Sequence, residues 1–257
     1  IDNCHALNGS GGAIYSSGYY ESDQYIESKL IIENSTINNC TTAPNGAGGA
    51  IYSSGYAVIE NSNFTNNWAR NGGALYIINE TIKAPNGNYI IRNSNFINNT
   101  ANWAGAIFNY RESSVTITSS NFTGNKASDI AGAIFGHMLV TNTTIINSTF
   151  TNNTALNGYG GAVKNDNNMT IINSTFINNS ALNGSGGAID SEHNMTIINS
   201  IFKNNRAKKA GAIVIYGENM NMTGLIIENN NATSREGAIF TGMSCNITIN
   251  NSTIINN

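Results

Sequence analysis

The chain has 257 residues, a formal net charge of -3 and only 11% charged residues, but 48 asparagines, 26 glycines and 2 prolines. A soluble chain usually carries about 25% charged residues, so uncharged polar groups must keep this surface hydrated. The sparse Lys and Arg form no basic stripe of the kind that attracts nucleic acid or an anionic membrane, so we expect neither partner.

No apolar run approaches the about 20 residues that a membrane-spanning helix needs, so we expect no direct insertion into a membrane. The chain shows no initiator Met, signal peptide or anchoring tail. It opens within a repeat at Ile1 and closes within a repeat at Asn257. We therefore expect a single repeat domain over residues 1–257, a fragment of a longer protein that is uncapped at both ends.

From the first residue onward, one sequence unit recurs along the whole chain. A bulky apolar residue is followed two positions later by Asn-Asn in most copies, then by Ala, and later by a Gly-Ala-aliphatic triplet. At intervals of 25 to 36 residues the bulky column reads Ile1, Ile37, Phe64, Phe96, Phe122, Phe150, Phe176, Phe202, Ile227 and Ile254. The aliphatic column keeps the same register and reads Ile14, Ile51, Leu75, Ile107, Ile134, Val163, Ile189, Ile213 and Ile239.

This unit predicts short strands rather than helices. Asn, Gly and β-branched residues are weak or poor helix formers, which excludes a helical solenoid. Short strands such as residues 170–172 and 187–189 remain, separated by Asn and Gly corners. A period near 26 residues suits three strands and three turns per coil. We predict an all-β fold, a right-handed parallel β-helix of about nine coils, with its handedness inferred from the right-handed preference of parallel crossovers.

Stacking of coils explains the low charge. Like charges in adjacent coils, about 4.8 Å apart, would repel by about 1 kcal/mol in water. Asn amides can instead donate to one neighbour and accept from the other. We therefore expect the first Asn of the motif to form a hydrogen-bonded ladder that is broken at Gly124. The predicted members are Asn66, Asn98, Asn152, Asn178 and Asn204.

In the amino-terminal half, the residue after each Gly-Ala-aliphatic triplet is aromatic. Strand alternation predicts that this column points outward, opposite the buried aliphatic residue. Its first five rings could form a platform on which sugar rings stack, or a ladder that only stabilises neighbouring strands. The whole column reads Tyr15, Tyr52, Tyr76, Phe108, Phe135, Lys164, Asp190, Val214 and Phe240.

Two amino-terminal coils are long, with inserts that include residues 16–25 and 79–89 and leave from the same corner. We expect these inserts to project side by side. They carry Tyr19, Tyr20, Tyr25 and Tyr89. Tyr, Asn and acidic side chains on protruding loops recognise glycans or proteins by stacking and hydrogen bonding, although a tolerated loop insertion is the alternative. Together with Tyr15, Tyr52 and Tyr76, these four tyrosines make up the predicted binding surface.

Acidic and basic residues gather further along the chain. Counted from the Gly of each repeat, His137, Asp166 and Glu192 share one column, and Lys164 and Asp190 stack two positions earlier. Two carboxylates one coil apart approach the about 5 Å separation of a retaining glycosidase, or could hold a cation. The alternative is a mixed-charge surface patch in which Lys164 pairs with Asp190. No Arg stands beside these acids and a Lys base would lie against Asp190, so we predict no catalytic residues. We also predict no metal site.

The three cysteines are too few for a disulfide framework. Cys4 and Cys40 replace the second Asn of the motif in consecutive copies. Their separation suits a disulfide, and free thiols stacked in the interior are the alternative.

The F-x-N-N-x-A pattern followed by GGAI, as at Phe176 to Ala181 and residues 186–189, resembles the repeats of the polymorphic outer-membrane proteins of chlamydiae. The residues between the motif positions are mostly Asn, Ile, Ser and Thr, a composition similar to that of the adhesin-like surface proteins of methanogenic archaea. The likeness covers nearly the whole chain, with departures at Cys4 and Cys40 and at Gly105 and Gly132, which follow Ala rather than Gly. The resemblance implies a secreted, surface-displayed segment used in attachment, and it carries over no catalytic residues.

The sequence thus predicts a non-catalytic, extracellular segment of a cell-surface adhesin or stalk that needs no cofactor. Its expected partners are glycans or cell-surface proteins, recognised through the aromatic face and the two long loops. The alternative is a fragment of a carbohydrate-active β-helix enzyme, a polysaccharide lyase or hydrolase that uses Asp166, Glu192 and His137. A third interpretation is an inert spacer that only projects other domains.

Overall fold

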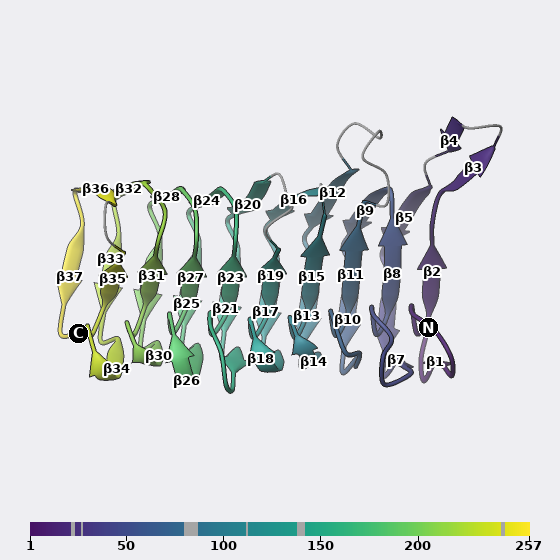
Figure 1. Cartoon of the computed structure of the whole chain (residues 1–257), viewed down its shortest axis with the longest axis horizontal. Coiled ribbons are helices and arrows are strands. Elements are labelled where there is room, and N and C mark those ends of the chain that lie inside the picture. The colour runs from purple at the N-terminus through teal and green to yellow at the C-terminus, as the bar shows by residue number, and fades with distance from the viewer. Residues whose placement is uncertain (22–23, 27, 80–86, 112, 138–141, 243–244) are drawn as a thin grey trace.

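The computed structural model describes the chain except for residues 22–23, 27, 80–86, 112, 138–141 and 243–244. The described residues form short strands and no helix. Strands of one coil pair with their counterparts in the next, and every pairing between coils is parallel. The coils stack into one elongated solenoid with the two termini at opposite ends (Figure 1). The predicted parallel β-helix of about 26 residues per coil is confirmed.

Sheet 1 carries the bulky column. Its nine strands are, in spatial order, β37 (Thr253–Ile255), β33 (Ile226–Glu228), β29 (Ile201–Lys203), β25 (Thr175–Ile177), β21 (Thr149–Thr151), β17 (Asn121–Thr123), β13 (Asn95–Ile97), β10 (Asn63–Thr65) and β6 (Thr36–Asn38). Phe150 pairs with Phe176, and Phe176 pairs with Phe202. Their buried rings lie 4.7 and 4.9 Å apart and are nearly parallel. The expected stack of phenylalanines inside one parallel sheet is therefore confirmed.

Sheet 2 follows sheet 1 in the chain and was not predicted as a separate wall. Its six strands are β14 (Thr100–Trp103), β18 (Lys126–Ile130), β22 (Thr154–Ala155), β26 (Ser180–Ser185), β30 (Arg206–Lys209) and β34 (Asn231–Arg235). Nearer the amino terminus, β1 (His5–Ala6) and β7 (Thr41–Thr42) form a separate pair. The Ala of the motif points inward here and is fully buried, as at Ala155 and Ala181.

Sheet 3 carries the Gly-Ala-aliphatic triplet. Its strands are β2 (Ile14–Ser16), β8 (Ile51–Ser54), β11 (Leu75–Ile78), β15 (Ile107–Tyr110), β19 (Ile134–Gly136), β23 (Val163–Asn165), β27 (Ile189–Ser191), β31 (Ile213–Ile215) and β35 (Ile239–Thr241). The aliphatic residue of each strand faces the core. A β-carbon at Gly187 would lie 2.0 Å from the carbonyl oxygen of Gly211. Consecutive coils approach too closely there for any side chain, which explains the Gly of this triplet.

Sheet 4 closes each coil. Its strands are β5 (Lys29–Glu33), β9 (Tyr56–Glu60), β12 (Gly87–Arg92), β16 (Ser113–Thr118), β20 (Asn142–Ile146), β24 (Met169–Ile172), β28 (Met195–Ile198), β32 (Asn219–Thr223) and β36 (Asn246–Asn250). Buried residues alternate with partly exposed ones, as expected for a sheet with one face on the core. An antiparallel hairpin of β3 (Tyr19–Glu21) and β4 (Gln24–Ile26) projects from the stack (Figure 1).

The predicted amide ladder is wrong, because the first Asn of the motif turns the chain at a corner. This Asn is exposed and has a φ of 54° to 58°. The residues concerned are Asn66, Asn98, Asn152, Asn178 and Asn204. Left-handed φ values favour Gly and, among other residues, Asn. Gly124, with a φ of 67°, therefore fits the same column without breaking anything.

The second Asn of the motif forms the amide ladder instead. The Nδ2 of Asn179 donates to Asn205 Oδ1 and to the carbonyl oxygen of Phe150, both at 3.0 Å. Its Oδ1 accepts from the backbone N–H and the Nδ2 of Asn153, both at 3.0 Å. The ladder runs through Asn67, Asn99, Asn125, Asn153, Asn179, Asn205, Asn230 and Asn257. These amides satisfy buried backbone groups at a corner where no strand pairing can do so.

Replacing Asn178 by alanine is expected to lower the free energy of unfolding by about 1 kcal/mol, because a β-carbon disfavours the left-handed region. Asn178→Gly is expected to leave stability nearly unchanged, since glycine adopts this φ freely. Urea denaturation of both variants checks the prediction. Equal losses from the two variants would show that the side chain of Asn178, and not its backbone angle, stabilises the corner.

Candidate functional site

The aromatic column lies on the outer face of sheet 3, starting at its amino-terminal end. Tyr15 pairs with Tyr52, and Tyr52 pairs with Tyr76. The ring centroids lie 4.7 and 5.3 Å apart, with interplanar angles of 6° and 12°. Tyr15 is 58% exposed, and the other two tyrosines are half-buried. These three residues, called the tyrosine ladder below, present a continuous outward row of rings.

Phe108 and Phe135 continue the column but are buried, which corrects the predicted platform of five outward rings. Trp103 lies edge-on to both, with ring centroids 6.1 and 6.4 Å away. Ala104 and Ala131 belong to the same apolar cluster. In these two coils Ala replaces the first Gly of GGAI, and its methyl group supplies apolar surface against the phenylalanines. Burial of this surface favours a second, smaller core over an open platform.

The first insert forms the β3–β4 hairpin. Tyr19 is exposed on β3. Tyr20 and Tyr25 pair through their backbones across the hairpin, and their side chains lie outside the described part of the structure. The predicted projection of this insert is therefore seen, with Tyr19 on it.

The second insert does not present Tyr89, which corrects the predicted binding surface. Tyr89 lies in β12, is 2% exposed, and donates its hydroxyl to the carbonyl oxygen of Ser53 at 3.0 Å. The reason is strand alternation, because Tyr89 stands two residues before the buried Ile91 and so shares its inward face. Residues 80–86 of this insert lie outside the described residues.

Charged residues continue the outer face of sheet 3 where the aromatic column ends. Lys164 pairs with Phe135 on one side and with Asp190 on the other. Asp166 and Glu192 each follow their strand at the same position, one coil apart. The columns counted from the sequence therefore lie side by side as expected.

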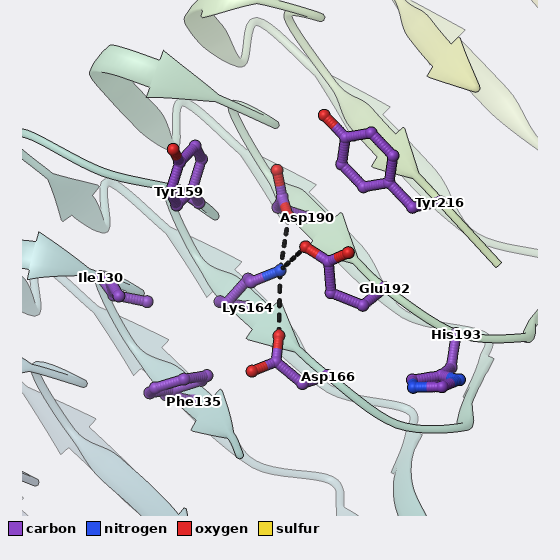
Figure 2. Close-up of a pocket in the computed structure, with 9 residues that line it drawn as sticks. All are labelled: Ile130, Phe135, Tyr159, Lys164, Asp166, Asp190, Glu192, His193 and Tyr216. Atoms are coloured by element: carbon purple, nitrogen blue, oxygen red, sulfur yellow. Dashed lines mark hydrogen bonds and ion pairs between the residues drawn. The ribbon is translucent and has the colours of Figure 1, made fainter. Parts of the chain in front are cut away.

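Lys164 is the centre of this charged cluster. Its Nζ lies 3.0 Å from Asp166 Oδ1, 2.8 Å from Asp190 Oδ1 and 2.6 Å from Glu192 Oε1 (Figure 2). Lys164 is 5% exposed and Asp190 is 1% exposed. The hydroxyl of Ser185 donates to Asp190 Oδ2 at 2.6 Å. Lys164 does pair with Asp190, but within a largely buried group of four charges rather than a surface patch.

The electrostatics of the cluster keep Lys164 charged. Burial alone would lower the pKa of Lys164, but contact with Asp190, Glu192 and Asp166 outweighs it, and the pKa is raised above its usual value. Burial raises the pKa of Asp190, against the opposing effects of Lys164 and Ser185. A lysine with a raised pKa is a fixed cation and a poor proton acceptor. Lys164 therefore serves to hold the carboxylates.

A groove of about 620 Å³ opens over this cluster. Its lining residues are Ile130, Phe135, Tyr159, Lys164, Asp166, Asp190, Glu192, His193 and Tyr216. Tyr159 and Phe135 lie on one side of the charges and Tyr216 on the other (Figure 2). The volume falls within the about 300 to 1,000 Å³ of small-ligand sites. A charged floor between aromatic walls suits a polar ring with one apolar face.

A family model described as a right handed beta helix region matches residues 85–254, about two thirds of the chain. This chain belongs to the right-handed β-helix family. The Chlamydia polymorphic membrane protein repeat matches residues 61–78, which supports the predicted likeness to that repeat. The likeness to archaeal adhesin-like proteins stays a prediction.

No curated protein and no solved structure matches this β-helix. Within the described ranges, it contains no helix that is both long and apolar enough to cross a membrane.

Two walls of the groove in this β-helix were not predicted. Tyr216 directly follows β31, one coil beyond Glu192 in the same column, so counting five residues from Gly211 would have found it. Tyr159 comes from the corner before β23. Residues at that corner become neighbours of sheet 3 only through the path of the folded chain, and no repeat signal marks Tyr159.

His137 does not join the charged cluster. Its ring packs against Tyr110 and Phe135, with centroids 4.8 and 5.8 Å away. Burial lowers the pKa of His137, although Asp166 opposes this. The three residues of the alternative catalytic hypothesis are therefore divided: Asp166 and Glu192 meet at Lys164, and His137 lies in the aromatic cluster.

Cys4 and Cys40 are free thiols in adjacent coils. Cys40 is buried at the start of the amide ladder, where its N–H donates to Asn67 Oδ1 at 2.9 Å. Burial raises the pKa of Cys40 to about 11, which keeps the thiol neutral. Across the described residues, no group of three or more His, Cys, Asp or Glu is arranged to hold a metal ion.

Proposed function

We propose that this β-helix is a non-catalytic segment of an extracellular, cell-surface protein that binds glycans through the outer face of sheet 3. The observation that carries the proposal is the tyrosine ladder, in which three rings stack in consecutive coils with Tyr15 open to solvent. The repeat match at residues 61–78, to a polymorphic membrane protein family, supports a place at the cell surface. Surface proteins are the second class of partner for the same face.

Stacked rings on a rigid sheet suit weak, repeated contacts. A ring that stacks on an aromatic side chain gains about 1 to 3 kcal/mol in nucleic-acid complexes, which is a guide for sugars. Several such contacts along one stack raise the overall affinity through effective concentration. Tyr19 on the projecting β3–β4 hairpin adds a further exposed ring at the same end of the molecule. These features support attachment to a polymeric glycan.

The charged cluster supports a non-catalytic role. In a retaining glycosidase the sugar lies between two carboxyl groups about 5 Å apart. Here Lys164 Nζ stands between Asp166 and Glu192 and contacts both, at 3.0 and 2.6 Å. A general base must be unprotonated near the working pH so that it can accept a proton, whereas the raised pKa of Lys164 keeps its amine protonated. We propose that the cluster holds and orients the polar groups of a bound glycan and transfers no proton.

Replacing Tyr15, Tyr52 and Tyr76 together by serine is expected to weaken glycan or cell binding by at least about tenfold, because each lost stacking contact is worth about 1 to 3 kcal/mol. Binding of the purified chain to a glycan array and to cells checks this, alongside thermal stability. Tyr56→Ser is the matched control, since Tyr56 is half-buried on sheet 4, beside Lys29.

Unchanged binding in the triple variant would place the site elsewhere, and no binding by the unmodified chain would favour an inert spacer. Turnover of any polysaccharide, lost in Asp166→Asn or Glu192→Gln, would establish the enzyme alternative instead.

A further inference from the structure

The groove over Lys164 adjoins the aromatic column and is not needed for stacking on the tyrosine ladder. We propose that it is a subsite for a sugar that carries a free, protonated amino group, so that the preferred glycan is an amino-sugar polymer. This inference rests on the proposed glycan-binding function and names its ligand class. Its basis is the combination of a cavity, aromatic walls and an excess of negative charge in one place.

The charge of the groove favours a cation. One lysine faces three carboxylates, which leaves an excess of two negative charges when all are ionised. Lys164 Nζ donates to Asp190 Oδ1 and to Glu192 Oε1, and Asp166 Oδ1 lies 3.0 Å from the same nitrogen. The single ammonium group is thus surrounded by carboxylates that already outnumber it. An anionic glycan would therefore meet net repulsion on entering the groove.

Two of the carboxylates can reach a ligand. The side chain of Glu192 is 44% exposed and that of Asp166 is 14% exposed, whereas Asp190 is closed off beneath them. Lys164 contacts Oε1 of Glu192 and Oδ1 of Asp166, so the second oxygen of each can accept from an ammonium group. Such charge-assisted hydrogen bonds are about twice as strong as neutral ones.

The walls of the groove fit the rest of a sugar. Tyr159 and Tyr216 each expose nearly half of their surface and stand on opposite sides of the charges (Figure 2). Aromatic faces bind the apolar face of a sugar ring by stacking and attract a nearby cation. Phe135 belongs both to the aromatic column and to the groove lining. A glycan chain that lies along the tyrosine ladder can therefore continue into the groove on the same sheet.

A second lysine lies near one wall. Lys209 Nζ is 5.8 Å from the centroid of Tyr216, but it is 3.1 Å from the centroid of Phe240 and is not part of the groove lining. It therefore stacks on Phe240 and does not reduce the excess negative charge of the groove. His193 also lines the groove, to one side of the charged cluster (Figure 2).

The test compares three tetrasaccharides of different charge by isothermal titration calorimetry under mildly acidic conditions, which keep the sugar amines protonated. They are β-1,4-linked glucosamine, its N-acetylated form, and a galacturonic acid oligomer. The glucosamine tetramer is expected to bind at least about tenfold more tightly than the other two, which corresponds to one charge-assisted hydrogen bond. Equal binding of the free and acetylated amines would overturn the proposal.

Substitutions in the groove test whether the preference for the free amine arises there. Glu192→Gln and Asp166→Asn are each expected to weaken glucosamine binding by about tenfold and to leave the acetylated oligomer unaffected. Glu228→Gln is the matched control, because Glu228 also pairs with a lysine, Lys203 at 3.4 Å, but lies on sheet 1. Unchanged binding in Glu192→Gln, or an equal loss in Glu228→Gln, would contradict the assignment of this groove.

Two further results separate this inference from the proposed function. If the triple serine variant of the tyrosine ladder loses glycan binding but free and acetylated oligomers bind alike, the ladder stands and the amino-sugar subsite fails. If a tetralysine peptide binds as tightly as the glucosamine tetramer and depends equally on Glu192, the groove recognises protein amines and the sugar assignment is wrong. Absence of binding by all three oligosaccharides rejects the amino-sugar subsite, while the glycan-array and cell-binding assay still decides the proposed function.

Discussion

Replacing Asn179 by alanine is expected to lower the free energy of unfolding by about 4 kcal/mol. Its amide is fully buried and makes four hydrogen bonds, to Phe150, to Asn205 and twice to Asn153. Alanine removes all four and leaves the N–H of Asn153 and the carbonyl of Phe150 without these partners inside the corner. Each buried group left unsatisfied costs about 1 to 3 kcal/mol, and the missing amide also leaves a cavity.

Urea denaturation followed by circular dichroism measures this loss. The adjacent Asn178→Gly variant is the control, since it also removes an asparagine of the same motif but one whose side chain is exposed. A loss below about 1 kcal/mol for Asn179→Ala would mean that water enters the corner and replaces the amide. The contrast between neighbouring asparagines separates the backbone role of the first from the hydrogen-bonding role of the second.

Replacing Lys164 by methionine is expected to lower the free energy of unfolding by about 3 to 5 kcal/mol at neutral pH, because removing one partner of a buried ion pair leaves uncompensated charge. Asp190 is 1% exposed and would keep only Ser185 as a hydrogen-bond partner from this cluster. The loss is expected to shrink as the pH falls. Without Lys164 the folded pKa of Asp190 lies further above its unfolded value near 3.8, so protonation at low pH favours the folded variant.

The intact protein is expected to lose stability at high pH, where Lys164 loses its proton. The raised pKa of Lys164 contributes stability that is fully present below its unfolded value of 10.5 and is lost as the pH rises through the folded value. Thermal melts of the intact protein and of Lys164→Met at neutral and acidic pH test whether the stability loss of the variant shrinks at low pH. Lys203→Met, at the more exposed pair with Glu228, is the control and should cost less than about 1 kcal/mol. An equal deficit of Lys164→Met at both pH values would contradict the electrostatic explanation.

Much of this architecture follows from counting along the chain. A parallel stack places each residue over the residue at the same position of the next coil, so a column in the sequence becomes a row of contacts. Phe150 over Phe176 and Lys164 over Asp190 were predictable for this reason. The outward direction of Tyr15 also followed, because alternation along a strand is a local property. Tyr216 lay within reach of the same reasoning.

The positions of the corners could not be predicted by counting residues between repeats. The second Asn, rather than the first, enters the interior because the first takes the left-handed φ that turns the chain, and the pattern Asn-Asn looks alike for either assignment. Tyr89 was taken for a loop residue because the start of β12 depends on the register of the neighbouring coils.

The repeat therefore specified the stack, its core columns and the rows on its outer face, because each arises from contacts between equivalent positions. Only the folded chain specified the complete groove, because one of its walls does not belong to a column of sheet 3. Lys164 and Tyr216 occupy columns that can be counted, whereas Tyr159 arrives from the corner before β23. Their meeting depends on how the corner carries the chain from sheet 2 to sheet 3, a long-range geometry set by packing across the whole coil.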